Sequence, residues 1–149
     1  MISKIIIFDE GFKITEKHIA FSVNQERVDT SDFSRMILST LWPEFYKDRN
    51  HPLCIGDVVS KTLPTGQTLH ALVTHSFDKQ NWKKNNICTK ELIQYCFNKI
   101  HSNMPIGTIL IGNSFIESLI INTAPAEIVK GMYQSDKNIS LYLPKGVRF

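Results

Sequence analysis

The stretch IAFSVNQERVDTSDFSRMI, residues 19–37, contains the features that decide the fold of this chain. It begins as an apolar run typical of a buried strand and ends with apolar residues at helical spacing, joined by a polar loop without glycine. A loop that leads from a strand into a helix can bind an anion, because the first-turn N–H groups lack partners within the helix. Such loops usually contain glycine where the backbone approaches a phosphate. Here the loop carries Arg27, Asp29 and Asp32, so it indicates a nucleotide site, a modified one or an ordinary turn.

The composition is that of an ordinary folded domain. The chain has 149 residues, of which 42% are hydrophobic and 21% charged, so we expect a single domain over residues 1–149. A net charge of +3 is too small to indicate nucleic-acid binding by itself. The longest apolar runs have the length of strands, and the first residues do not resemble a signal peptide, so we expect no membrane association.

The three cysteines, Cys54, Cys88 and Cys96, are an odd number without a metal-type spacing. Reduced thiols in a cytoplasmic protein are the expectation from this pattern. Cys88 and Cys96 fall in or beside a predicted helix, where burial as small hydrophobes is expected.

Apolar runs and turn signals predict strands that alternate with helices along the chain. The runs that favour strands are residues 5–8, 18–23, 55–60, 68–75, 108–111 and 139–143. The segments that favour helices are residues 33–41, 90–100 and 126–133. We expect the strand at residues 5–8 to be buried, because it is a continuous apolar run rich in β-branched residues.

Local signals support these boundaries. Ser31 or Asp32 can cap the first helix and Thr89 the second, and the sequence Pro-Thr-Gly-Gln at residues 64–67 predicts a turn between two strands. The apolar residues at helical spacing in the first helix are Phe33, Met36, Ile37 and Leu41.

Strands that alternate with helices indicate an α/β fold, with a single three-layer domain whose mixed central sheet is flanked by helices. Ligands of such sheets bind at the carboxyl ends of the strands. The loops after Phe8, Val23, His75 and Ile111 are therefore the candidate walls of a binding site.

The order of elements and a few identities resemble the macrodomain family, in particular its compact branch of ADP-ribose binders and ADP-ribosyl hydrolases. That branch has a loop of the form V-N-x-x-G-V-M-G-x-G-I-A after its second strand. The aligned run here is VNQERVDTSDFS, residues 23–34, in which Val23, Asn24 and Val28 match. Further segments similar to family elements are WPEFY at 42–46, LHALVTHS at 69–76, ILIGNS at 109–114 and ISLYL at 139–143. The resemblance spans nearly the whole chain and implies a macrodomain-like fold.

The resemblance implies roles for residues that follow the first two strands. The family's acid after the first strand accepts a hydrogen bond from the adenine amino group, and by position this acid is Asp9. An ordinary strand-end acid in a turn with Gly11 explains Asp9 equally well. The family's strand-end asparagine contacts the distal ribose, so Asn24 inherits that role, although asparagine is also a good turn residue.

The glycine loop departs from the family pattern. Arg27, Thr30 and Asp32 stand at glycine positions, where their side chains would fill space otherwise open to a pyrophosphate, and Asp29 and Asp32 would repel it. Two charges about 4 Å apart interact by roughly 4 kcal/mol at an effective dielectric of about 20, enough to abolish micromolar binding unless Arg27 compensates. The second phosphate loop keeps Gly112 but lacks the further glycines, so the site is either remodelled or lost.

The ligand-binding residues predicted in this way are Asp9, Asn24, Arg27, Val28, Thr30, Ser31, Gly112, Asn113, Ser114 and Phe115.

The signals for catalysis are weaker. Some family members use a lysine after the central strand with an acid in the second phosphate loop, and here His75 and Glu117 stand near those positions. A neutral histidine could act as a base toward water, but a strand-end histidine that faces solvent is the favoured interpretation of His75. The sequence contains no Ser-His-Asp arrangement, metal-ligand cluster or P-loop pattern, so we expect no metal or cofactor. The other histidines are too dispersed to indicate ligands: His18, His51, His70 and His101.

Three functions compete. The first is a divergent macrodomain that binds ADP-ribose or a related nucleotide, weakly or through a remodelled pocket and more in keeping with a binder than with an active hydrolase. The second is a pseudo-macrodomain that acts as a protein-interaction module, with Trp82 as a candidate anchor. The third, single-stranded nucleic-acid binding through Trp82, Lys83 and Lys84, is disfavoured by the small net charge.

Overall fold

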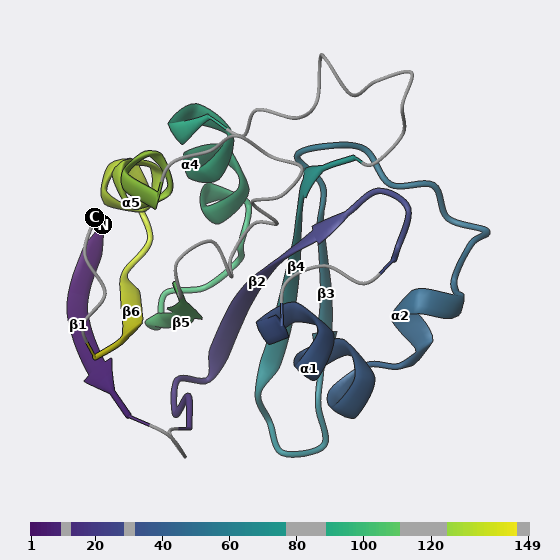
Figure 1. Cartoon of the computed structure of the whole chain (residues 1–149), viewed down its shortest axis with the longest axis horizontal. Helices are drawn as coiled ribbons and strands as arrows, with labels where there is room; N and C mark the ends of the chain where they lie inside the picture. Colours follow the sequence, from purple (N-terminus) through teal and green to yellow (C-terminus); the bar gives the residue numbers. More distant parts are fainter. Residues whose placement is uncertain (10–12, 29–31, 77–88, 111–124, 146–149) are drawn as a thin grey trace.

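The strands of this chain form one mixed sheet. The computed structural model describes residues 1–9, 13–28, 32–76, 89–110 and 125–145. Within these residues the strands lie in the order β1-β6-β5-β2-β4-β3, and every neighbouring pair is parallel except β3–β4 (Figure 1). The strand bounds are β1 (Ile2–Phe8), β2 (His18–Asn24), β3 (Val58–Thr62), β4 (Thr68–His75), β5 (Ile106–Ile109) and β6 (Ile139–Pro144).

Helices cover both faces of the sheet and divide the core into two clusters. The helices are α1 (Asp32–Leu41), α2 (Glu44–Lys47), α4 (Lys90–Asn98) and α5 (Pro125–Gln134). Apolar side chains of α4 and α5 pack on one face, around Ile93, Phe97 and Ile128. Those of α1 and α2 pack on the opposite face, around Ile37 and Phe45. The predicted α/β class and its three layers are therefore confirmed, because helices flank the mixed sheet on both sides (Figure 1).

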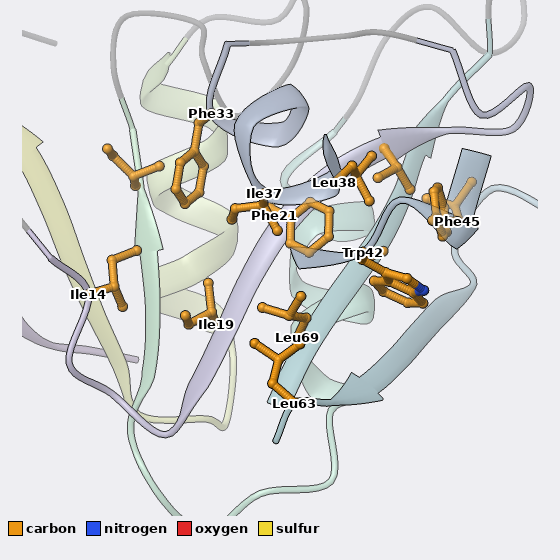
Figure 2. Close-up of a cluster of buried hydrophobic side chains, with 14 of the residues drawn as sticks. Ile14, Ile19, Phe21, Phe33, Ile37, Leu38, Trp42, Phe45, Leu63 and Leu69 are labelled. Carbon is orange, nitrogen blue, oxygen red and sulfur yellow. The ribbon is translucent and has the colours of Figure 1, made fainter. Parts of the chain in front are cut away.

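Side-chain alternation in β2 explains how one strand serves both layers. Ile19, Phe21 and Val23 belong to the cluster beneath α1, whereas Ala20 belongs to the cluster beneath α4 and α5. Figure 2 shows Ile19 and Phe21 beside Ile37 of α1. Because β2 is buried on both faces, apolar residues stand on both of its faces, and the buried Ser22 is the polar residue between Ile19 and Val23.

Residues 5–8 form a strand as predicted, but the prediction that this strand is buried is wrong. These residues lie in β1, which among the described strands is at the edge of the sheet and pairs with β6 alone. Ile6 and Phe8 pack against the cluster beneath α1, but Ile5 and Ile7 are 52% and 60% exposed. A continuous apolar run indicates a strand but does not indicate whether both of its faces are covered.

Other boundaries shift for local reasons. The strand expected at residues 55–60 is β3, which begins at Val58 because a turn precedes it: the Asp57 carboxylate accepts a hydrogen bond of 2.7 Å from the Cys54 N–H, and Gly56 adopts a φ of +97°. In α1, Met36 and Leu41 are exposed, and Leu38 takes their place in the core beside Ile37.

Several local predictions are confirmed. Thr89 caps α4, since its side chain accepts a hydrogen bond from the Leu92 N–H at 3.2 Å. The turn at residues 64–67 joins β3 to β4, with Gly66 at a φ of +93°. Cys96 is buried as predicted, and burial raises the pKa of its thiol to about 12. Cys88 lies outside the described residues. Among the helices that the structure describes, none has the length and apolar character needed to cross a bilayer.

The contact between α4 and α5 depends on a glycine. A β-carbon added at Gly131 would lie 2.6 Å from both the Ile93 β-carbon and the Lys90 carbonyl oxygen. Backbone atoms of a neighbouring helix cannot turn aside, so the two helices are in close contact only because position 131 lacks a side chain.

We expect Gly131→Ala to lower the free energy of unfolding by about 2 kcal/mol, measured by urea denaturation. Alanine is the better helix former by about 1 kcal/mol, so a loss shows that the clash exceeds the gain in propensity. Lys130→Ala is the matched control on the exposed side of the same helix and should change stability by less than about 0.5 kcal/mol. A Gly131→Ala protein as stable as wild type would contradict the packing described.

Candidate functional site

The parallel strands bring the first two candidate residues to one edge of the sheet. β1, β6, β5 and β2 run in the same direction, so Asp9 after β1 and Asn24 at the end of β2 both lie at the carboxyl edge. Three inter-strand spacings separate these strands, which is roughly 14 Å. Asp9 is exposed and Asn24 is buried. The candidates outside the described residues are Thr30, Ser31, Gly112, Asn113, Ser114, Phe115 and Glu117.

Asn24 closes the loop that follows β2. Its side-chain amide donates a hydrogen bond of 3.1 Å to the Val28 carbonyl, and its side-chain oxygen accepts one of 3.2 Å from the Val28 N–H. The Asn24 side chain is fully buried. This pair of bonds brings residue 28 back to the end of the strand, so Asn24 defines the loop as a tight turn.

Arg27 has the backbone conformation of a glycine. Its φ is +55°, and among the described residues other than glycine it alone has a positive φ. The left-handed region costs a residue with a β-carbon about 1 kcal/mol, which glycine avoids. In the family pattern position 27 is a glycine, so the loop keeps the shape that the pattern implies although the residue has changed.

The Arg27 side chain is directed away from the surface. Its guanidinium donates a 2.8 Å hydrogen bond to the His51 carbonyl and lies 5.3 Å from the centre of the Phe45 ring. The residue is 5% exposed. At this exposure the side chain forms little of the loop surface, so it does not fill the space above the backbone as the sequence suggested. A phosphate contact through Arg27 stays a prediction.

Side chains tie the loop after β2 to the segment that follows α2. Gln25 donates a 2.8 Å hydrogen bond to the Leu53 carbonyl. In the opposite direction, the Arg49 guanidinium donates to the carbonyls of Glu26 and Arg27. Together with the Arg27 bond, these contacts join the two segments, and each segment donates side-chain hydrogen bonds to carbonyls of the other. Sequence analysis missed Arg49, and no pattern in the sequence pointed to it.

His75 is buried, so the expectation that it faces solvent is wrong. It has 0% exposure at the end of β4, where its carbonyl accepts a 3.0 Å hydrogen bond from the Gln25 N–H. Its Nδ1 lies 2.9 Å from the Thr74 hydroxyl, which in turn contacts the Ser22 hydroxyl. Burial lowers the pKa of His75 to about 3, so the imidazole is neutral at physiological pH. His75 therefore supports the loop through its backbone and a hydroxyl chain.

The exits of β2 and β4 are joined by a further contact. The buried Ser76 hydroxyl donates a hydrogen bond to the Glu26 carboxylate. Charge-assisted bonds of this kind are stronger than neutral ones. Within the described residues no group of three histidine, cysteine or acidic side chains is placed to hold a metal ion. The backbone N–H groups of Gln25, Arg27 and Val28 are bonded within the protein, to the His75 carbonyl, the Asn24 carbonyl and the Asn24 side chain.

Sequence analysis treated the remaining histidines as dispersed, which is wrong for two of them. His18 and His70 meet at the opposite, amino edge of the strands, with His18 Nδ1 2.8 Å from His70 Nε2. The turn at residues 64–67 fixes the register of β3 against β4 and so places Ser60 opposite His70, but no sequence signal places His18 beside His70.

Comparison with known proteins shows the fold. No protein-family model matches this sequence, and no curated protein matches it. Among solved structures, the chain is similar to the macrodomain of Mycobacterium tuberculosis DarG, with a TM-score of 0.60, 11% identity and coverage of 93% of this chain and 96% of that one. It is also similar to an Oceanobacillus iheyensis macrodomain with MES bound, with a TM-score of 0.56, 15% identity and coverage of 94% and 82%.

A third similar structure is alphavirus P23pro-zbd, with a TM-score of 0.58 and 13% identity. The match covers 93% of this chain but only 21% of that protein's length. At such identities the likeness concerns the fold alone. The macrodomain-like fold that the sequence implied is therefore confirmed.

The buried His75 predicts how stability depends on pH. The folded-state pKa of about 3 lies below the ordinary histidine value of about 6.5, so the unfolded chain binds a proton that the folded chain excludes. The free energy of unfolding is therefore highest above about pH 6.5. It falls by about 1.4 kcal/mol per pH unit as the pH falls from there toward 3.

We expect His75→Gln to reduce this slope by about 1.4 kcal/mol per pH unit between about pH 4.5 and 6, measured by urea denaturation. His101→Gln, at an exposed position, is the control and should leave the slope unchanged. An unchanged slope in His75→Gln would show that His75 does not titrate as a buried group.

Proposed function

We propose that this chain binds ADP-ribose or a related nucleotide at the carboxyl edge of its sheet, weakly and without efficient hydrolysis. The observation that carries the proposal is the left-handed turn at Arg27, closed by Asn24. A turn of this kind leads the chain from β2 toward the N-terminus of α1, where first-turn N–H groups favour an anion, and here the turn persists without the glycine.

The distribution of polar groups along the edge supports a ligand of nucleotide size. Asp9 and Asn24 are three strands apart, a span that suits an extended ligand with a base at one end and a ribose at the other. The similar solved structures include two macrodomains, which supports placing the ligand at this edge. The Asp9 contact with the base and the Asn24 contact with the distal ribose are part of the proposal.

Weak binding follows from charge. Asp29 and Asp32 are close in sequence to the turn, and the guanidinium that could offset them is engaged by the His51 carbonyl and the Phe45 ring. A charge repulsion of roughly 4 kcal/mol would move a micromolar Kd to about 1 mM. Hydrolysis needs a base in contact with water, and the histidine candidate at this edge is fully buried.

Titration of ADP-ribose by calorimetry tests the proposal on wild type and three variants. We expect a Kd of about 1 mM or somewhat tighter for wild type. Arg27→Gly should bind within about threefold of wild type, because glycine keeps the left-handed turn without strain. Asn24→Ala should bind at least about tenfold more weakly, because the loop loses both bonds that close it.

Asn50→Ala is the matched control, since Asn50 is an exposed asparagine in the segment that faces the loop, and it should bind as wild type does. If Arg27→Gly abolishes binding while wild type binds, the guanidinium and not the turn is the anion ligand. No binding by wild type at millimolar ADP-ribose would overturn the proposal and leave the interaction-module function.

A further inference from the structure

We propose that Ser60, His70 and His18 form a nucleophilic serine site, at the amino edge of the sheet, that hydrolyses small acyl esters. Ser60 Oγ lies 2.7 Å from His70 Nδ1, and His70 Nε2 lies 2.8 Å from His18 Nδ1. A hydroxyl bonded to an imidazole that is itself oriented by a third group is the arrangement that activates a serine. It is independent of the nucleotide proposal.

Strand register builds this arrangement. Ser60 of β3 and His70 of β4 are directly opposite each other in an antiparallel pair. β2 lies on the other side of β4, with His18 opposite Thr68, so His18 is within reach of the His70 ring. The planes of the His18 and His70 rings are inclined by 16° to each other, and the ring centres are 5.1 Å apart. Three neighbouring strands thus fix the positions of the three side chains.

The hydrogen-bond chain has one direction that suits catalysis. If the Ser60 hydroxyl donates to His70 Nδ1, the His70 proton is on Nε2 and is donated to His18 Nδ1. His70 then presents a lone pair to the serine proton, which is the general-base form. Burial, followed by the nearby His18, lowers the pKa of His70 to about 4, so this neutral form predominates at physiological pH.

The site opens into a cavity. Ser60 is exposed, and together with both histidines it lines a hollow of about 710 Å³. Lys99 and His101 line the same hollow. Lys99 is fixed by a 3.0 Å bond to the Gly56 carbonyl and by the Tyr95 ring.

Asp57 is the acid among the lining residues, and its carboxylate accepts a hydrogen bond from the Cys54 N–H. The cavity therefore places a nucleophile and a base beside the Lys99 ammonium, and Asp57, the acid among the described residues that line it, is already hydrogen-bonded.

The reaction that this geometry supports is acyl transfer to water in two steps. Ser60 Oγ attacks the ester carbonyl carbon as its proton moves to His70 Nδ1. The bond to the leaving alcohol breaks, and the proton on His70 passes to that alcohol. Water then attacks the acyl-serine, gives its proton to His70 and releases the carboxylic acid, which restores the Ser60 hydroxyl. Water is the second substrate. His18 is a positioning residue whose Nδ1 accepts the hydrogen bond from His70 Nε2.

A fluorophosphonate probe and p-nitrophenyl acetate test the nucleophile. With the probe, an Oγ–P bond forms and the P–F bond breaks, so wild type should gain one adduct, located on Ser60 by peptide mass spectrometry. Ser60→Ala should show no adduct at that peptide and lose at least about 100-fold in ester hydrolysis above background. His70→Gln should lose labelling rate by a similar factor.

Thr62→Ser is the matched control. Thr62 is on the same strand face two residues on, and its hydroxyl faces the Thr68 hydroxyl at 3.2 Å rather than an imidazole. This variant should be labelled at Ser60 and not at residue 62. Labelling of wild type no faster than of Ser60→Ala overturns the proposal. Labelling of a folded His70→Gln protein at the wild-type rate overturns the role of His70.

The pH profile separates a catalytic from a structural role. Hydrolysis should be constant above about pH 5 and fall with a midpoint of about 4, since the neutral imidazole is the base. The titratable groups that line the cavity beside His70 are His18, Asp57, Lys99 and His101. His18→Asn keeps an acceptor for the His70 proton and should retain more activity than His18→Leu. A midpoint near the ordinary histidine value of about 6.5 would assign the base to another histidine and contradict the proposal.

Discussion

The parallel pairing of β2 with β4 is the constraint on which the rest of the structure depends. The two strands stay in register from His18 opposite Thr68 to Val23 opposite Val73, and then slip so that Asn24 lies opposite His75. The slip lets β2 turn sharply, with Asn24 bound to Val28 and Gln25 bound to the His75 carbonyl. At the other end the same pairing brings His18 beside His70. One pair of strands thus organises polar groups at both edges of the sheet.

The turn after β2 shows how a loop can keep its shape while its sequence changes. Arg27 pays about 1 kcal/mol of backbone strain for a left-handed conformation. Its hydrogen bond to the His51 carbonyl and its contact with Phe45, each worth on the order of 1 kcal/mol when buried, hold the side chain against the segment after α2. The side chain at this glycine position therefore links the loop to the segment after α2. Arg49 of that segment in turn donates a hydrogen bond to the Arg27 carbonyl.

The fold was predictable because apolar periodicity and capping residues are local signals. The run at residues 18–23 became β2, Thr89 caps α4, and the turn at residues 64–67 joins β3 to β4. Burial was harder to predict, because it depends on which strand occupies the edge: the apolar β1 is exposed on one face, whereas the polar His75 is enclosed. The direction of the Arg27 side chain and the meeting of His18 with His70 depend on tertiary contacts that no local pattern encodes.

A titration followed by amide proton–nitrogen correlation spectra tests most directly whether the carboxyl edge of the sheet binds the nucleotide. ADP-ribose added to wild type should shift the amide signals of Asn24, Gln25, Val28 and Asp9, which lie at that edge. The amide signals of His18, Ser60 and Thr68, at the amino edge, should stay in place. Shifts confined to the amino edge, or none at millimolar ligand, would contradict the account.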